Sequence, residues 1–267
     1  MSAYEAIKKN ILSNKYPFLD YQNLLNEHIK EKDKLNFDFE NYIIVGIGGS
    51  SQGSKAVSHI LNQKNIYYFD HLNARKVDQV LNSLNHSDTG FIFISKSGST
   101  SEVLTLYDYI SAFVGDKFDK TKNFLAITEN NDAPLYRFAT HSGFHCIEHN
   151  PNIGGRFSIF SHTCMIPISL FFENYLDMFK GFESAISDFL NKEPVSDDMS
   201  PIDIALKKYD LILSGKRIDI ILLYGDELYE IGNWMKQLYA ESLGKNGFGY
   251  LPVISQMTQD QHSVLQL

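Results

Sequence analysis

The chain has 267 residues, of which 43% are hydrophobic and 21% are charged, and its formal net charge at pH 7 is −8. This is a globular composition, sufficient for one large domain or two smaller ones. The acidic balance argues against broad nucleic-acid binding, which needs a basic face. No apolar run approaches the roughly 20 residues that span a membrane. Cys146 and Cys164 give no disulfide framework, and no secretion signal is recognisable, so we expect a cytoplasmic protein.

Residues 1–38 predict an N-terminal helical segment with a break at Pro17. Strands and helices then alternate, a pattern that predicts right-handed crossovers and a parallel sheet covered on both faces. We therefore expect an α/β fold, a three-layer αβα sandwich, over residues 39–185. Its predicted strands are 42–47, 66–69, 90–95 and 124–128, and its predicted helices are 52–63, 76–84, 100–114 and 157–182, the last bounded by Gly181.

A second unit of the same kind is predicted near the end of the sequence. Residues 186–215 are more polar and are expected to form a connection. Residues 218–224, IDIILLY, predict a strand, and a helical pattern follows it. We expect 216–267 to form the start of a second, incomplete α/β domain.

The segment ISKSGSTSE, residues 94–102, follows a predicted strand and precedes a predicted helix. The spacing of Ser99 and Glu102 fits a capping box at the mouth of that helix. Unpaired N–H groups and the helix dipole favour an anion there. Hydroxyl groups and one cation can add to such a site, although a solvated, well-capped turn is the plainer reading. The candidate residues are Ser95, Lys96, Ser97 and Thr100.

Two further loops contain paired glycines. GIGGSSQG, residues 46–53, follows a strand but matches neither of two known motifs. Ser51 stands where the dinucleotide fingerprint needs its third glycine, and Ser54 stands where a Walker A loop needs lysine. The segment still allows close approach of a ligand to the backbone. NIGGRFS, residues 152–158, contains Arg156, a permanent planar cation suited to phosphate or to a developing oxyanion. Loops at one edge of an open α/β sheet then suggest a phosphorylated small molecule as ligand.

The helical stretch 227–245 places Glu241 beside the apolar stripe that contains Trp234. Gln237 lies one turn earlier on the same side. Such a carboxylate would lose part of its hydration, which suits a general base. A helix-edge glutamate paired with a cation is the alternative. His141, His145 and His149 have the spacing of a metal site, but Gly143 and a short strand at Ile147 argue against one.

Together these segments resemble the phosphoglucose isomerase family, in its compact bacterial form. The resemblance rests on VGIGGSSQGSKA, ISKSGSTSE, NIGGRFSIFS, WMKQLYAESLGKNG and QDQHSVLQ, in family order. The first two alone would support only the wider sugar-isomerase (SIS) fold. The resemblance implies an enzyme of glycolysis and gluconeogenesis that interconverts glucose 6-phosphate and fructose 6-phosphate through an enediol, without a metal or organic cofactor.

The resemblance also implies roles for individual residues. Glu241 would be the base, Arg156 would steady the enediolate, and His262, from the partner subunit of a homodimer, would assist ring opening. The substrate and its phosphate would contact Gly49, Ser50, Ser95, Lys96, Ser97, Thr100 and Gln237.

The resemblance leaves alternatives open. Family members have a further C-terminal portion, with a lysine implicated in ring opening, that has no match here, so we expect a fragment, a shortened product or a chain that needs another polypeptide. The chain would then be either an active isomerase or a catalytically silent sugar-phosphate-binding module. A related isomerase for an amino or pentose sugar phosphate is a third possibility.

Overall fold

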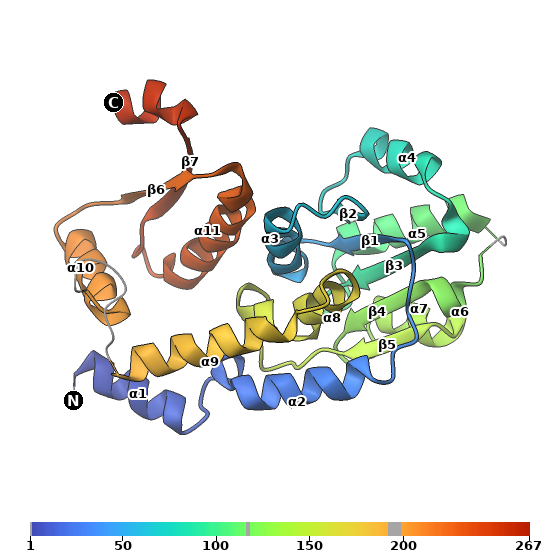
Figure 1. Ribbon diagram of the computed structural model, residues 1–267, viewed down its shortest axis with the longest axis horizontal. Helices are drawn as coiled ribbons and strands as arrows, with labels where there is room; N and C mark the ends of the chain where they lie inside the picture. The colour runs from blue at the N-terminus through green and yellow to red at the C-terminus, as the bar shows by residue number, and fades with distance from the viewer. Residues whose placement is uncertain (1, 116–117, 192–198) are drawn as a thin grey trace.

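A five-stranded parallel sheet forms the centre of the larger part of the molecule (Figure 1). The computed structural model describes residues 2–115, 118–191 and 199–267. The strand order is β2-β1-β3-β4-β5, and every neighbouring pair is parallel. The strands are β1 (Asn41–Gly46), β2 (Ile66–Phe69), β3 (Thr89–Ile94), β4 (Phe124–Thr128) and β5 (His145–Glu148).

Helices cover both faces of this sheet, which confirms the predicted three-layer α/β fold. Alternate strand residues point to opposite faces. Phe91 and Phe93 pack on one face with side chains of three helices, whereas Ile92 and Ile94 pack on the other with Ile166. The first face carries α4 (Ala74–Ser83), α5 (Ser101–Val114) and α7 (Pro134–Ser142). The second carries α3 (Gln52–Ile60) and α8 (His162–Phe171), and the short α6 (Lys120–Asn123) precedes β4.

The N-terminal segment is helical with an interruption at Pro17, as predicted. It comprises α1 (Ala3–Leu12), the 3-10 turn η1 (Pro17–Leu19) and α2 (Tyr21–Lys32). Helix α2 packs beside α8 and α9 (Leu176–Asn191) and forms a further helical layer with them. Aromatic side chains fill this layer: Phe160 stacks on Phe182 at a ring-centroid distance of 4.2 Å.

The apolar segment 157–182, predicted as one helix, forms three pieces instead. A 3-10 stretch η5 (Gly155–Phe160) comes first. Helix α8 ends at Phe171, and the next residue, Phe172, has an extended backbone. Helix α9 then continues to Asn191. Gly181 does not bound a helix: it lies inside α9, where glycine costs only about 1 kcal/mol relative to alanine.

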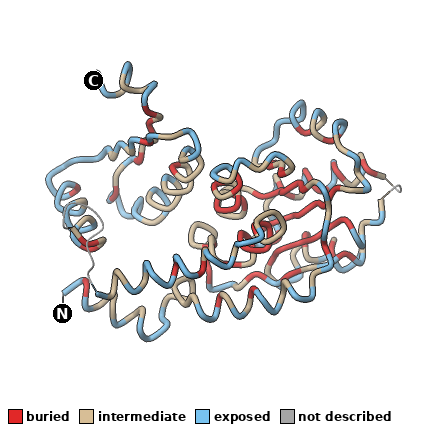
Figure 2. Tube along the Cα trace, in the orientation of Figure 1, coloured by how far each residue is buried: buried red, intermediate tan, exposed pale blue. Residues whose placement is uncertain are grey.

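A second, two-stranded parallel sheet joins β6 (Ile218–Tyr224) to β7 (Leu251–Met257). Helix α10 (Pro201–Leu213) precedes it, α11 (Tyr229–Leu243) connects the two strands, and the 3-10 turn η7 (Gln259–His262) follows β7. Figure 2 shows that burial is concentrated on the larger sheet; in α11 only Gly232 is buried. Within the described ranges, no helix has the length and apolar character needed to cross a membrane.

The predicted connection 186–215 contains the end of α9 and all of α10, and its residues 192–198 lie outside the described part of the chain. Helix α10 begins with a complete capping box formed by Ser200 and Asp203. The division of the chain at residues 38, 185 and 215 stays a prediction.

Candidate active site

The strand order places a topological switch point between β1 and β3, at the carboxyl edge of the larger sheet. β1 leads into α3 on one face and the neighbouring β3 leads into α5 on the other, so the chain departs in opposite directions from adjacent strand ends. Open α/β sheets bind ligands at such a switch point, outside the carboxyl ends of the strands. The loops predicted as candidates after β1 and β3 both lie there.

The loop after β3 places hydroxyl groups at the start of α5. Ser95 is buried and its hydroxyl lies 2.7 Å from that of Thr100, the N-cap of the helix. Gly98 has φ +66°, a conformation that favours glycine. The exposed side chains of Ser97 and Ser99 hydrogen-bond to each other at 3.0 Å. The unpaired N–H groups of the first turn and these hydroxyls together form an anion-friendly surface.

The capping box predicted at Ser99 and Glu102 is wrong. The N-cap is Thr100, and it has no side-chain capping bond. The residue three positions after Thr100 is Val103, which has no polar side-chain atom to complete a box. Glu102 instead accepts a hydrogen bond of 3.0 Å from Ser101.

Lys96 connects this loop with the loop that precedes η5. Its Nζ donates to the carbonyl oxygen of Pro151 at 2.8 Å and lies 3.7 Å from a carboxylate oxygen of Glu129. The Lys96 side chain remains about one-third exposed, at 34%. Its ammonium group is therefore close to the switch point and accessible from solvent.

The loop after β1 packs tightly against η5. This loop is the 3-10 turn η2 (Gly48–Ser50), and Ser50, its last residue, is half-buried. A Cβ added to Gly49 would lie 2.2 Å from the carbonyl carbon of Gly155, so only glycine fits there. The Ser158 hydroxyl donates to the carbonyl oxygens of both glycines, at 2.9 and 2.6 Å. This contact fixes η5, and with it Arg156, beside η2.

The C-terminal half of α11 completes the site. Arg156 donates from Nη1 to Oε1 of Glu241 at 3.1 Å and from Nε to the Ser242 hydroxyl at 2.8 Å. Gln237 donates to the other oxygen of Glu241 at 3.3 Å. A Cβ on Gly48 would lie 3.0 Å from Nε2 of Gln237, so the η2 backbone is in contact with this side chain. A carboxylate, an amide and a guanidinium thus meet at the sheet edge.

Glu241 does not border a buried helix face as predicted, and it loses only part of its hydration. Its side chain is 50% exposed, and Trp234 is only half-buried. The reason is that α11 packs on a sheet of two strands, which cannot bury a wide helical face. The predicted alternative of a helix-edge glutamate paired with a cation describes the observed contact with Arg156.

The histidines do not join this group in the described part of the chain. His262 is exposed in η7, which follows the carboxyl end of β7. Glu241 lies near the C-terminal end of α11, which leads to the amino end of β7 (Figure 1), so the two residues lie at opposite edges of the small sheet. His149 is buried beyond β5, and its Nε2 lies 3.1 Å from the carbonyl oxygen of Ile153. Among the residues described, no cluster of three or more His, Cys, Asp or Glu side chains is arranged to hold a metal ion.

Sequence reasoning missed three residues that support the site: Ser242, Ser158 and Glu129. Ser242 immediately follows Glu241, so its position at the end of the same helix was the available signal. Ser158 and Glu129 act through contacts with residues far away in the sequence, which no local pattern shows.

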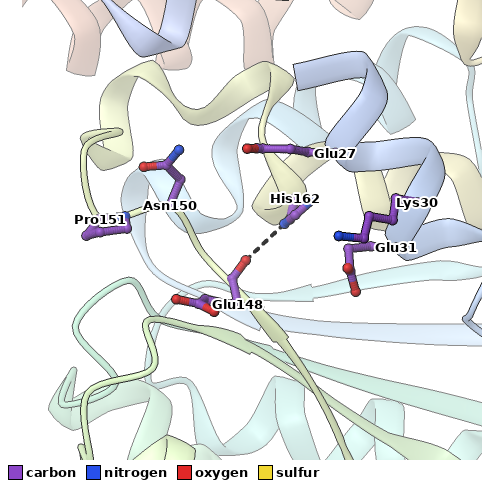
Figure 3. Close-up of a pocket in the computed structure, with 7 residues that line it drawn as sticks. All are labelled: Glu27, Lys30, Glu31, Glu148, Asn150, Pro151 and His162. Carbon is purple, nitrogen blue, oxygen red and sulfur yellow. Dashed lines mark hydrogen bonds between the residues drawn. The ribbon is translucent and has the colours of Figure 1, made fainter. Parts of the chain in front are cut away.

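A separate cavity of about 330 Å³ adjoins the site without containing it. Figure 3 shows Glu27, Lys30 and Glu31 of α2 facing the segment 148–151 across this space. Nδ1 of His162 lies 2.9 Å from the carbonyl oxygen of Glu148. Three carboxylates line the cavity against one lysine, so it does not suit the anion that the neighbouring loop favours.

Comparison with known proteins gives a consistent family. The family model for phosphoglucose isomerase matches residues 31–253. A probable glucose-6-phosphate isomerase of Methanococcus maripaludis is 31% identical over 98% of this chain and 61% of its own length. A glucose-6-phosphate isomerase of Campylobacter jejuni is 31% identical over 85% of this chain and 57% of its own length. The chain thus spans about three-fifths of these relatives.

Solved structures show the same fold. A hypothetical protein of Thermus thermophilus superposes with a TM-score of 0.80 at 22% identity and covers 99% of this chain and 66% of its own. A glucose-6-phosphate isomerase of Chlamydia trachomatis superposes with a TM-score of 0.70 at 20% identity, over 98% of this chain and 52% of its own.

Proposed function

Because the chain belongs to the phosphoglucose isomerase family, we propose that its site interconverts glucose 6-phosphate and fructose 6-phosphate. The observation that carries this proposal is the meeting of Glu241, Gln237 and Arg156 beside the loops at the carboxyl edge of the sheet. Aldose–ketose isomerisation needs one base near C1 and C2 and a cation near the oxygens where charge develops.

The substrate phosphate binds at the start of α5. Thr100 and the exposed Ser97 supply hydroxyl donors beside the first helical turn, and Ser95 holds Thr100 in place. Lys96 supplies positive charge once it turns from the carbonyl oxygen of Pro151. A phosphate held at this point converts remote binding energy into alignment of the reacting carbons.

The proton moves between C2 and C1 on the carboxylate of Glu241. Glu241 takes the proton from C2 of the open-chain aldose, and the electron pair of that C–H bond forms the C1–C2 double bond of the enediolate, with the negative charge on O1. The hydroxyl proton of O2 passes to O1, the carbonyl forms at C2, and the proton held by Glu241 is delivered to C1. Arg156 stabilises the negative oxygen of the intermediate, and this requires its guanidinium to shift from the Glu241 carboxylate toward the substrate. Gln237 orients the base, and Gly49 and Ser50 line the sugar.

His262 acts in ring opening from a second copy of the chain. It lies at the carboxyl edge of the small sheet, whereas Glu241 lies near the amino edge, about a helix length away. One chain therefore does not bring the two side chains together, and a homodimer would supply the histidine. The dimer, the cytoplasmic location and the absence of a cofactor stay predictions.

A catalytically silent sugar-phosphate-binding module is the second candidate. Two observations favour it. The Glu241 side chain is half-exposed, and its ion pair with Arg156 engages both of the charged groups that the chemistry needs. In that case the loop after β3 would still bind sugar phosphates. An isomerase for an amino or pentose sugar phosphate would bind those compounds in preference to glucose 6-phosphate.

The test is formation of fructose 6-phosphate from glucose 6-phosphate by this chain. Glu241→Gln should lower kcat by about 10²–10⁴-fold, the usual contribution of a general base, with little change in sugar-phosphate binding. Glu40→Gln, at the opposite edge of the sheet, is the control and should leave kcat unchanged. Equal turnover by the parent chain and Glu241→Gln, with binding intact, would establish the silent module instead.

A further inference from the structure

A second polar cluster holds the other end of α11, away from the proposed chemistry. Nζ of Lys55, on α3, lies 2.7 Å from Oδ2 of Asp70 and 3.2 Å from Oε1 of Glu230. Gln52 donates to Oε2 of Glu230 at 2.9 Å and to its backbone carbonyl oxygen at 3.2 Å. Asn233 donates to the same carboxylate at 3.2 Å. The first turn of α11 is therefore bonded to the larger sheet unit.

The cluster is substantially shielded from water. The side chains of Lys55, Asp70 and Glu230 are 26%, 15% and 12% exposed. Burial alone would lower the pKa of Lys55, but the adjoining carboxylates of Asp70 and Glu230 outweigh burial and raise the pKa. The ammonium group thus stays charged and keeps both carboxylates bound. Removing one partner of such a shielded pair costs more than breaking an exposed surface ion pair, because it leaves a shielded charge without compensation.

The cluster lies at one end of α11 and Glu241 lies near the other, so a small tilt of the helix at the cluster would displace Glu241. Glu230 and Glu241 lie on one continuous helix, about 16 Å apart at a rise of about 1.5 Å per residue. A tilt of α11 by about 4° about its first turn would therefore displace Glu241 by about 1 Å. A misplacement of about 1 Å can cost about 10²-fold in rate.

We propose that Lys55 is a positioning residue: by binding Glu230 and Asp70 together it fixes α11 on α3 and so sets where Glu241 and Gln237 meet the substrate. The expected effect on kcat rests on the proposed function, whereas the fixing of α11 on α3 does not. The phosphate loops lie on the larger unit and do not depend on the cluster.

Lys55→Met tests the inference with two independent measurements. In the isomerase assay kcat should fall by about 10-fold or more, while KM changes by less than about 3-fold, because transition-state alignment is lost and phosphate binding is kept. The chain has a single tryptophan, Trp234, on α11. Acrylamide quenching of its fluorescence should rise when the helix loosens, whether or not the chain is catalytically active.

Two variants serve as controls. Lys34→Met removes an ion pair of 2.6 Å between the turn after α2 and Glu31 near the end of α2, and it should change neither kcat nor quenching. Lys55→Arg keeps the charge and should retain most of the parent kcat. If Lys55→Met does not fold, the nearly isosteric Glu230→Gln replaces it in both measurements.

The outcomes separate the two proposals. Unchanged quenching of Trp234 in a folded Lys55→Met, or a kcat equal to that of the parent chain, would overturn the positioning role. A parent chain without isomerase activity would overturn the proposed function instead, and the quenching experiment would still decide whether Lys55 fixes α11. If the double variant Lys55→Met/Glu230→Gln has the same effect as either single variant, the two residues act through one contact.

Discussion

Arg156 makes three contacts that fix its guanidinium at the sheet edge. It bonds to Glu241 and to Ser242, and its guanidinium carbon lies 4.4 Å from the centre of the Phe157 ring. That ring stacks on Phe18 at 4.2 Å, so the N-terminal segment supports the position of the arginine. A planar fork that is both stacked and hydrogen-bonded cannot be replaced by the point charge of a lysine.

Arg156→Lys should therefore lower kcat by about 10²-fold or more, the usual cost of losing a donor to a developing oxyanion. The chain should remain folded, because the Phe157–Phe18 stack and the Ser158 bonds to η2 do not involve the guanidinium. Steady-state kinetics measures the effect, and Arg137→Lys on the exposed surface of α7 is the control. A kcat within about 3-fold of the parent would contradict the assigned role.

His28 is a buried histidine that no sequence pattern indicated. It is 1% exposed and packs edge-on against Tyr175, with a ring-centroid distance of 5.1 Å. Neither of its ring nitrogens has a hydrogen-bond partner among the described residues. Burial, with smaller effects from His162 and Lys32, lowers the pKa of His28 to about 4 from its ordinary value of 6.5. His28 is thus neutral in the folded chain at neutral pH.

The depressed pKa of His28 predicts a loss of stability in mild acid. Below about pH 6.5, His28 is protonated in the unfolded chain but stays neutral in the folded chain. The free energy of unfolding should therefore fall as the pH drops toward 4, by up to about 3 kcal/mol. Urea titrations across this range should show the slope, and His28→Phe should flatten it. The exposed His59→Gln is the control, and an equally steep slope in His28→Phe would contradict the assignment.

At the scale of elements, continuous apolar runs located the strands well and the helices less well. The runs at 66–69, 124–128 and 218–224 form β2, β4 and β6 with the predicted bounds. β2 and β4 are largely buried, and a strand buried on both faces reads as an unbroken apolar run whose ends are clear. β6 has a similar apolar sequence although most of its residues are exposed. The segment 157–182 is largely apolar but is not one helix. The chain is extended at Phe172, and the exposed Glu173 and Asn174 that follow are the polar signal for this break.

The contact between η2 and η5 depends on Gly49. A methyl group there would lie 2.2 Å from two atoms of Gly155, and backbone atoms cannot turn away. Gly49→Ala should therefore separate the two loops, move Arg156 by a fraction of an ångström and lower kcat by about 10-fold or more, with a drop in stability. Kinetics and thermal unfolding together measure this.

Gly181→Ala is the matched control for that substitution. Gly181 lies inside α9, and a Cβ there meets no described atom within 4 Å. Replacing glycine by alanine in an open helical position should stabilise the chain by about 0.5–1 kcal/mol and leave kcat unchanged. A loss of stability and kcat in Gly181→Ala as large as that in Gly49→Ala would show that the close approach of η2 to η5 is not the cause of the effect.

At the scale of the whole molecule, the sequence predicted the layers but not the docking of the two units. Two of the candidate loops, 46–53 and 94–102, could be assigned to one sheet edge because each follows a predicted strand. The site itself depends on contacts between α11 and residues more than 80 positions earlier, such as Arg156 with Glu241 and Gln52 with Glu230. Helical periodicity fixes which side a residue lies on, but it does not say which other element meets that side.

The second sheet exposes an apolar face that should make the purified chain self-associate. Ile218, Ile220, Leu222 and Tyr224 alternate along β6, and each is between 40% and 63% exposed. Parallel strands are normally covered on both faces, and exposed apolar patches promote association.

Sedimentation velocity should show larger species as concentration rises. Ile220→Lys should weaken this association by about 10-fold, because it replaces about 1.5 kcal/mol of apolar burial with a charge. Leu12→Lys, at a 66% exposed position on α1, should leave it unchanged. A parent chain that stays monomeric at all concentrations would show that this face is tolerated in water.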